Sequence, residues 1–187
     1  MKSKSEWRRL ASERRRSMPD NERYEASALI AQRLFSLEAW KQASVIYMYF
    51  GYGDEVQTGE ILECALAEGK RTALPRVLNE KDMVFSEIRS ADELDTGRFG
   101  IPEPSGEALE RVTDISPDII IVPCVGVAMD GNRIGHGRGY YDRVLCAHKD
   151  IPKICLAFEA QIVGAFTPQD TDIRMDMVIT EKRCVVV

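Results

Sequence analysis

DIIIVPCVGVAMDGNRIGHGRGYYDRVLCA, residues 118–147, is the stretch that decides the fold. It opens with an apolar run over 118–122, which predicts a buried strand ending at the following proline. It closes with residues 140–147, whose apolar side chains recur on one face of a helix. A strand, a loop rich in glycine and a helix therefore follow one another. In open α/β sheets, ligands bind outside the carboxyl ends of the strands, where this loop is expected to lie.

Glycine stands at every second position of the loop, at Gly135, Gly137 and Gly139. Glycine permits positive φ and lets a ligand approach the backbone closely, and successive exposed N–H groups form a concave anion site. The spacing is neither that of a P-loop, which ends in Gly-Lys-Ser/Thr, nor that of the dinucleotide motif Gly-x-Gly-x-x-Gly. Because short glycine patterns recur by chance, an ordinary turn between two elements stays an alternative at this point.

The rest of the chain alternates between helical and strand patterns. Helices are predicted over 4–17, 21–37 and 58–68, and strands over 44–50, 71–74, 83–88, 153–158, 177–179 and 184–187. This alternation favours an α/β fold, a three-layer sandwich in which a mostly parallel, Rossmann-like sheet is covered by helices on both faces. Residues 1–187 show no internal repeat or long linker and are expected to form a single domain. The longest irregular stretch, 96–107, is expected to be a loop over the site.

The composition is that of an ordinary globular protein. Of the 187 residues, 29% are charged and 44% are hydrophobic. No apolar run approaches the roughly 20 residues that span a bilayer, and the N-terminus lacks the apolar core of a secretory signal. We therefore expect a cytoplasmic protein without a membrane partner. The five cysteines are scattered and form no Cys-x-x-Cys pair, which argues against a zinc site and a disulfide framework.

Charge is unevenly distributed along the chain. Residues 1–16 contain seven Lys or Arg against two Glu, a net charge of +5, whereas the remainder contains 18 against 28, a net charge of −10. A basic arm can contact phosphates or nucleic acid. Nucleic acid is not expected as a partner, because the acidic body would repel a polyanion and no aromatic binding face is evident. For Arg14, Arg15 and Arg16, a solvated helix face without a ligand is about as well supported as a contact with an anionic partner.

The central motif resembles the signature of a known family. Val122-Pro123 followed by Asp130-Gly131-x-Arg133-Ile134-Gly135-x-Gly137-x-Gly139-Tyr140-Tyr141-Asp142-Arg143 is similar to that of the 5-formyltetrahydrofolate cyclo-ligases, also called methenyltetrahydrofolate synthetases. Shorter pieces match in order and spacing: Lys4-x-x-x-Arg8, Asp54-Glu55-Val56-Gln57-Thr58, Leu74-Pro75-Arg76, Gly100-Ile101-Pro102-Glu103-Pro104 and Asp172-x-x-x-Asp176-x-x-Ile179-Thr180-Glu181. Each short piece is weak evidence, whereas the long motif is specific and the ordered set covers nearly the whole chain.

The resemblance implies a site for ATP and Mg²⁺. The implied ATP-binding residues come from two parts of the chain: Lys4, Arg8, Arg133, Ile134, Gly135, His136, Gly137, Arg138, Gly139, Tyr140 and Tyr141. Asp142 and Asp176 are the implied metal ligands. Lys4 and Arg138 are expected to stabilise charge during catalysis, and no nucleophilic side chain is required. His136 can serve as a general acid or base, because imidazole titrates near pH 6.5, but its position varies in the family, which favours a tuning role.

By the same resemblance, the folate contacts Tyr52, Glu55, Gln57, Arg138 and Tyr140. An aromatic ring can stack on the flat pterin while carboxylate or amide groups pair with its edge. Without the resemblance, Glu55 is more simply an acid at a helix start, favoured by the helix dipole. Gln57 stands where relatives often carry an acidic residue, so its role is open. Cys124 and Met129 replace the common Gly and Phe, which we interpret as packing changes.

The implied reaction converts 5-formyltetrahydrofolate to 5,10-methenyltetrahydrofolate with ATP and Mg²⁺, releasing ADP and phosphate through a phosphorylated formyl intermediate. A monomer acting on a small-molecule folate, with or without a polyglutamate tail, is expected. Two other function classes stay open. One is a different ATP-dependent ligase or phosphotransferase on the same scaffold, and the other is a binding protein without activity. The presence of Lys4, Arg8 and Asp142 argues against the second.

Overall fold

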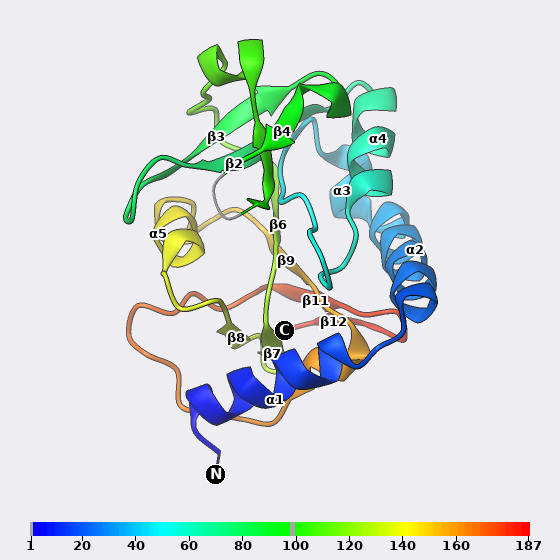
Figure 1. The fold of residues 1–187 in the computed structure, drawn as a ribbon, viewed down its shortest axis with the longest axis vertical. Coiled ribbons are helices and arrows are strands. Elements are labelled where there is room, and N and C mark those ends of the chain that lie inside the picture. Colours follow the sequence, from blue (N-terminus) through cyan, green and yellow to red (C-terminus); the bar gives the residue numbers. More distant parts are fainter. Residues whose placement is uncertain (1, 98–99) are drawn as a thin grey trace.

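The computed structural model describes residues 2–97 and 100–187 and is built around a seven-stranded sheet (Figure 1). The strands are ordered β12-β11-β9-β6-β1-β2-β3. Their bounds are β1 Val45–Tyr47, β2 Arg71–Val77, β3 Met83–Ile88, β6 Ile119–Val122, β9 Lys153–Leu156, β11 Met177–Ile179 and β12 Cys184–Val186. Neighbouring strands run parallel except at the two outer strands, β3 and β12. The mostly parallel sheet predicted from the sequence is confirmed.

Helices cover both faces of this sheet. α2 (Asp20–Ser36), α3 (Glu38–Gln42) and α4 (Gly59–Ala67) pack on one face, and α5 (Tyr140–Ala147) packs on the other. The side chains of β6 alternate between them: Ile119 and Ile121 join the core beneath α2, α3 and α4, whereas Ile120 and Val122 join the core beneath α5. A strand buried on both faces needs such an unbroken apolar run. The predicted three-layer arrangement is confirmed.

α1 (Lys4–Arg16) packs on a second, smaller sheet. This sheet consists of β7 (Gly126–Ala128), β8 (Arg133–Ile134) and β10 (Ile162–Val163), in the order β10-β7-β8. Figure 1 shows α1 crossing beside β7 and β8 at the lower edge of the molecule. Ala11 is fully buried at this contact, and a Cβ at Gly126 would lie only 3.1 Å from the Ala11 Cβ. Glycine therefore permits the close approach that places the basic helix beside the segments that follow β1 and β6.

β1 and β6 mark the place where the strand order reverses. From β1 the chain continues to β2 and β3 on one side, whereas β6, β9 and β11 follow one another on the other side. The segments that leave the carboxyl ends of β1 and β6 therefore diverge. Such a switch point is where open α/β sheets hold their ligands.

Some short segments depart from the prediction. β2 continues through Pro75 to Val77. Because β1 pairs with β2 only as far as Ala73, the proline nitrogen has no neighbouring strand on that side to which it would have to donate. The predicted loop at 96–107 is partly strand, since β5 (Pro102–Pro104) pairs with β4 (Leu94–Thr96). Residues 98–99 of that loop lie outside the described residues. The 3₁₀ helices Ala91–Glu93, Gly106–Glu110 and Glu159–Gln161, like α3, are too short for a period to be recognised.

All five cysteines are free thiols in this structure. Cys124 and Cys155 are buried, Cys64 is half-buried, and Cys146 and Cys184 are exposed. Over the described parts of the chain, no helix combines the length and the apolar character that a membrane crossing requires.

Candidate active site

A large cleft opens at the carboxyl ends of β1 and β6. Its volume is about 1150 Å³. Its walls are formed by α1, the segment that follows β1, the glycine loop with the start of α5, and the segment 169–173. A single small-molecule site occupies roughly 300–1,000 Å³. The cleft therefore has room for more than one ligand.

The cleft is basic, although the whole chain has a net charge of −5. Its walls carry eight Lys or Arg against six Asp or Glu. Lys4, Arg8, Arg15 and Arg16 all come from α1, and residues 4, 8 and 15 are spaced to share one face of the helix. Anionic ligands are therefore attracted to this cleft rather than to the acidic remainder of the surface.

The glycine loop has a backbone suited to an anion. Gly137 and Gly139 adopt φ values of 96° and 68°, which residues with a Cβ rarely adopt. Gly139 caps the N-terminus of α5, whose free N–H groups and dipole favour negative charge. Arg8 Nε donates to Gly135 O at 2.9 Å and joins α1 to the loop. Ile134, by contrast, is fully buried beneath α1 and does not line the cleft.

Arg133 holds the base of the loop. Its side chain is only 5% exposed, and its Nη2 donates to Asp142 Oδ1 at 2.9 Å. Its Nη1 donates to Pro123 O at 3.1 Å. Arg133 therefore fixes the Asp142 carboxylate on the first turn of α5 and ties the loop to the end of β6.

The two tyrosines that follow the loop have different surroundings. The Tyr140 hydroxyl donates to Asn79 O at 2.8 Å. The Tyr141 hydroxyl is buried and has no hydrogen-bond partner among the described residues. Burial raises the pKa of Tyr141 well above its ordinary value, so the group stays protonated. Because Tyr141 lines the cleft, it offers an unused hydrogen-bond donor to a ligand.

Lys4 is paired with a carboxylate that sequence reasoning did not assign to the site. Lys4 Nζ lies 2.6 Å from both oxygens of Asp172, and the two side chains are 19% and 11% exposed. Both residues line the cleft. A signal for Asp172 was present, since the last family-like segment begins with it. The segment carries two aspartates four residues apart, and their spacing alone does not tell which of them faces the cleft.

Asp176, the other predicted metal ligand, lies elsewhere. It directly precedes β11 and so stands at the amino end of that strand, whereas the cleft lies at the carboxyl ends of β1 and β6. Its carboxylate accepts the Lys153 N–H at 2.8 Å and lies 3.4 Å from Lys153 Nζ. The structure therefore does not bring Asp176 and Asp142 together. Residues 2–97 and 100–187 contain no cluster of three or more His, Cys, Asp or Glu that could hold a metal.

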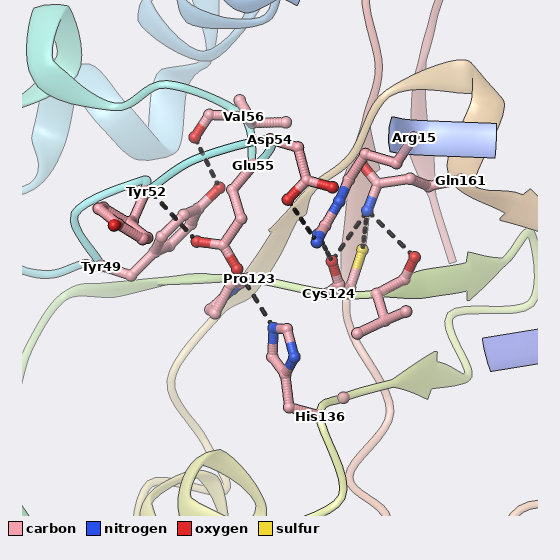
Figure 2. A network of polar contacts seen from close by, with 12 residues as sticks. Arg15, Tyr49, Tyr52, Asp54, Glu55, Val56, Pro123, Cys124, His136 and Gln161 are labelled. Carbon is pink, nitrogen blue, oxygen red and sulfur yellow. Dashed lines mark hydrogen bonds and ion pairs between the residues drawn. The ribbon is translucent and has the colours of Figure 1, made fainter. Parts of the chain in front are cut away.

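The segment after β1 faces the glycine loop (Figure 2). Glu55 Oε1 lies 3.2 Å from His136 Nε2, and Glu55 Oε2 accepts the Tyr52 N–H at 3.3 Å. Gln57 is turned back on its own segment, because its Nε2 donates to Glu55 O at 2.8 Å and to Gly53 O at 3.3 Å. Of the residues predicted to contact the folate, Tyr52, Glu55, Arg138 and Tyr140 line the cleft, and Gln57 does not.

The fold and the cleft together define an α/β protein with a basic cleft at the switch point of a mostly parallel sheet, where open α/β sheets hold their ligands. Comparison with known proteins narrows this class. The model of the 5-formyltetrahydrofolate cyclo-ligase family matches residues 1–181. The chain therefore belongs to this family, and the protein is a ligase.

Individual relatives agree with this assignment. The chain is 31% identical to the 5-formyltetrahydrofolate cyclo-ligase of Mus musculus over 183 residues, which cover 90% of this chain and 89% of the relative. It is 31% identical to a probable 5-formyltetrahydrofolate cyclo-ligase of Caenorhabditis elegans over 170 residues, 84% and 82% of the two chains. The NMR structure of Aquifex aeolicus 5,10-methenyltetrahydrofolate synthetase is 30% identical, with a TM-score of 0.84 and coverage of 98% and 92%.

Proposed function

We propose that the protein converts 5-formyltetrahydrofolate to 5,10-methenyltetrahydrofolate, using ATP and Mg²⁺ and releasing ADP and phosphate. The observation that carries the proposal is a single cleft in which the glycine loop meets the segment of Tyr52 and Glu55 through the Glu55–His136 contact. The relatives named above carry the names of this reaction. The cleft volume of about 1150 Å³ suits a nucleotide and a folate side by side.

The chemistry explains why ATP is needed. A formamide is a weak electrophile, and its oxygen is a poor leaving group. Transfer of the γ-phosphoryl group to the formyl oxygen turns that oxygen into part of a phosphate ester. N10 of the folate then attacks the formyl carbon, so that the N10–C bond forms, N10 loses its proton to solvent and the C–O bond breaks. The former formyl oxygen leaves with the phosphate.

The protein supplies alignment and positive charge for the phosphoryl transfer. Lys4 and Arg8 approach from α1, and Arg138 with the backbone N–H groups of the glycine loop approach from the adjoining wall. Lys4 must exchange the Asp172 carboxylate for a phosphate when the nucleotide binds. Arg8 already donates to the backbone of the loop, so it can align the loop and the phosphates together. Lys4 and Arg138 are the residues assigned to stabilising the transferred phosphoryl group.

Asp142 and Asp172 fit a Mg²⁺ ion by their chemistry. Both are oxygen donors of the cleft wall, and Mg²⁺ is usually held by one or two carboxylates together with phosphates and water. When bound there, Mg²⁺ would neutralise charge on the phosphates. Each carboxylate has a cationic partner in this structure, Arg133 for Asp142 and Lys4 for Asp172, so neither negative charge is left uncompensated.

The folate is assigned to the other side of the cleft. Tyr52 is half-exposed at the cleft wall and can stack on the pterin ring. Glu55 is 18% exposed and is held by His136 and by the Tyr52 N–H. The contact between Glu55 and His136 joins the segment assigned to the folate to the glycine loop, which supports a formyl end that lies near the transferred phosphoryl group.

A spectrophotometric assay tests the proposal. Purified protein with 5-formyltetrahydrofolate, ATP and Mg²⁺ should develop the near-ultraviolet absorbance of the methenyl product, and omission of ATP or chelation of the metal should abolish it. Folded protein that binds ATP but forms no such chromophore would point to a different ATP-dependent ligase. Product formed at the same rate without ATP would contradict the proposal.

A further inference from the structure

A buried arginine joins α1 to two loops of the cleft. The Arg15 side chain is 5% exposed, and its Nη2 donates to Asp54 Oδ1 at 3.0 Å. Its Nη1 donates to Cys124 O at 3.4 Å, an oxygen that also accepts Gln161 Nε2 at 2.8 Å (Figure 2). Arg15 Nε is buried and has no hydrogen-bond partner among the described residues. Arg15 therefore presents a firmly held guanidinium whose Nε–H has no partner among the described residues.

Asp54 carries a buried acceptor oxygen without a hydrogen-bond partner among the described residues. Its Oδ1 is taken by Arg15, whereas its Oδ2 is buried and accepts no hydrogen bond from the described residues. Arg16 Nε lies 3.8 Å from Oδ2, which is ion-pair distance but beyond a hydrogen bond. Arg15, Arg16 and Asp54 all line the cleft, and buried polar atoms of this kind normally find a partner.

The position of this pair separates it from the phosphate site. Arg15 follows Lys4 by eleven residues, which is about 16 Å along an α-helix. Asp54 lies between Tyr52 and Glu55, the two residues assigned to the folate. A donor and an acceptor stand there side by side, which suits a ligand edge that carries both kinds of group.

Gln57 does not provide the hydrogen bonds to that edge of the ligand. Its amide is engaged with the carbonyl oxygens of Glu55 and Gly53 and does not line the cleft. The carboxylate of Glu55 is engaged with His136 and the Tyr52 N–H. Within the described part of this segment, Asp54 Oδ2 is the buried carboxylate oxygen without a hydrogen-bond partner.

We propose that Asp54 and Arg15 recognise the 2-amino-4-oxo edge of the pterin, an assignment that rests on the proposed function. The pterin presents the 2-amino group and N3–H as neighbouring donors and O4 as an acceptor. Asp54 Oδ2 accepts from the donors, and Arg15 Nε donates to O4. The adenine of ATP also carries a donor beside an acceptor, but its phosphates belong at the far end of α1, near Lys4 and Arg8.

A pair of ligands tests the proposal by equilibrium binding. The probes are 5-formyltetrahydrofolate and its analogue without the 2-amino group, titrated into the full chain and into the Asp54→Asn variant. The wild-type protein should bind the amino ligand about 10- to 100-fold more tightly, the range expected for hydrogen bonds to a charged group. In the variant the amide oxygen must face Arg15, so its NH₂ group meets the ligand donors and the preference should be lost. Asp20→Asn, whose side chain is 94% exposed, is the matched control and should keep the preference.

Each result decides a different question. Loss of the preference in Asp54→Asn with unchanged ATP affinity supports the proposal. A preference that survives in the variant overturns it. If the variant also loses ATP affinity while it still distinguishes the two folates, Asp54 and Arg15 bind the adenine of ATP instead. Wild-type protein that binds both folates equally overturns it even if the variant does not fold. Wild-type protein that binds neither folate refutes the proposed function itself.

Discussion

Replacing Asp142 with asparagine is expected to lower ATP-dependent turnover by about 100- to 1,000-fold, the usual cost of removing a group that organises transition-state charge. Asp142 stands on the first turn of α5, beside the glycine loop, and its Oδ1 is held by Arg133. An asparagine oxygen can still accept that hydrogen bond, so the loop keeps its anchor while the cleft loses a negative charge. Turnover measured against metal concentration should show a weaker metal response, and the melting temperature should fall by only a few degrees.

Asp176→Asn is the matched control for this variant. Asp176 is 58% exposed and pairs with Lys153 at the amino end of β11, away from the cleft. The asparagine side chain can still accept the Lys153 N–H, so both turnover and stability should stay close to those of the wild type. Equal losses in Asp142→Asn and Asp176→Asn would show that the metal site has been assigned to the wrong carboxylates.

Replacing Lys4 with alanine should raise the KM for ATP by about 10- to 100-fold, since hydrogen bonds to charged groups contribute roughly 1.5–3 kcal/mol. The KM for the folate should change much less, because Tyr52 and Glu55 lie on another wall of the cleft. The removal also leaves the Asp172 carboxylate, which is 11% exposed, without its cation. Initial rates over a range of concentrations of each substrate separate the two effects.

Arg9→Ala is the control for Lys4→Ala. Arg9 lies on the same helix, is 64% exposed and pairs with Glu13 within α1. Its loss removes one positive charge from the basic arm but none from the cleft wall. If both variants raised the KM for ATP equally, the net charge of α1 rather than a contact of Lys4 would govern nucleotide binding.

The main elements of the fold could be predicted because their patterns are long. The apolar run over 118–122 contains β6, Ile119–Val122, which is buried on both faces, and the glycine loop and helix after it lie where the pattern placed them. What escaped prediction depends on pairing between distant segments. A proline such as Pro75 normally ends a strand, yet β2 continues through it. The missing N–H is tolerated because β1 pairs with β2 only as far as Ala73, and the length of β1 cannot be predicted from the sequence around Pro75.

The site could be predicted where one motif carries the residues, and less well where two segments must meet. Gly135–Gly139 and Asp142 form one continuous wall of the cleft. Asp172 and Asp176 share a segment, but only the folded chain shows that Asp172 meets Lys4 and Asp176 meets Lys153. Arg15 and Asp54 are 39 residues apart and resemble an ordinary helix cation and loop acid until α1 is placed against the loop after β1.

The measurement that tests the proposed chemistry most directly is the fate of the formyl oxygen. 5-Formyltetrahydrofolate labelled with ¹⁸O in the formyl group is converted with unlabelled ATP in unlabelled water, and the released phosphate is analysed by mass spectrometry. Phosphorylation of the formyl oxygen predicts one ¹⁸O atom in each phosphate that accompanies a methenyl product. Unlabelled phosphate formed together with that product would show that ATP is hydrolysed without passing its phosphoryl group to the formyl oxygen, and would contradict the mechanism.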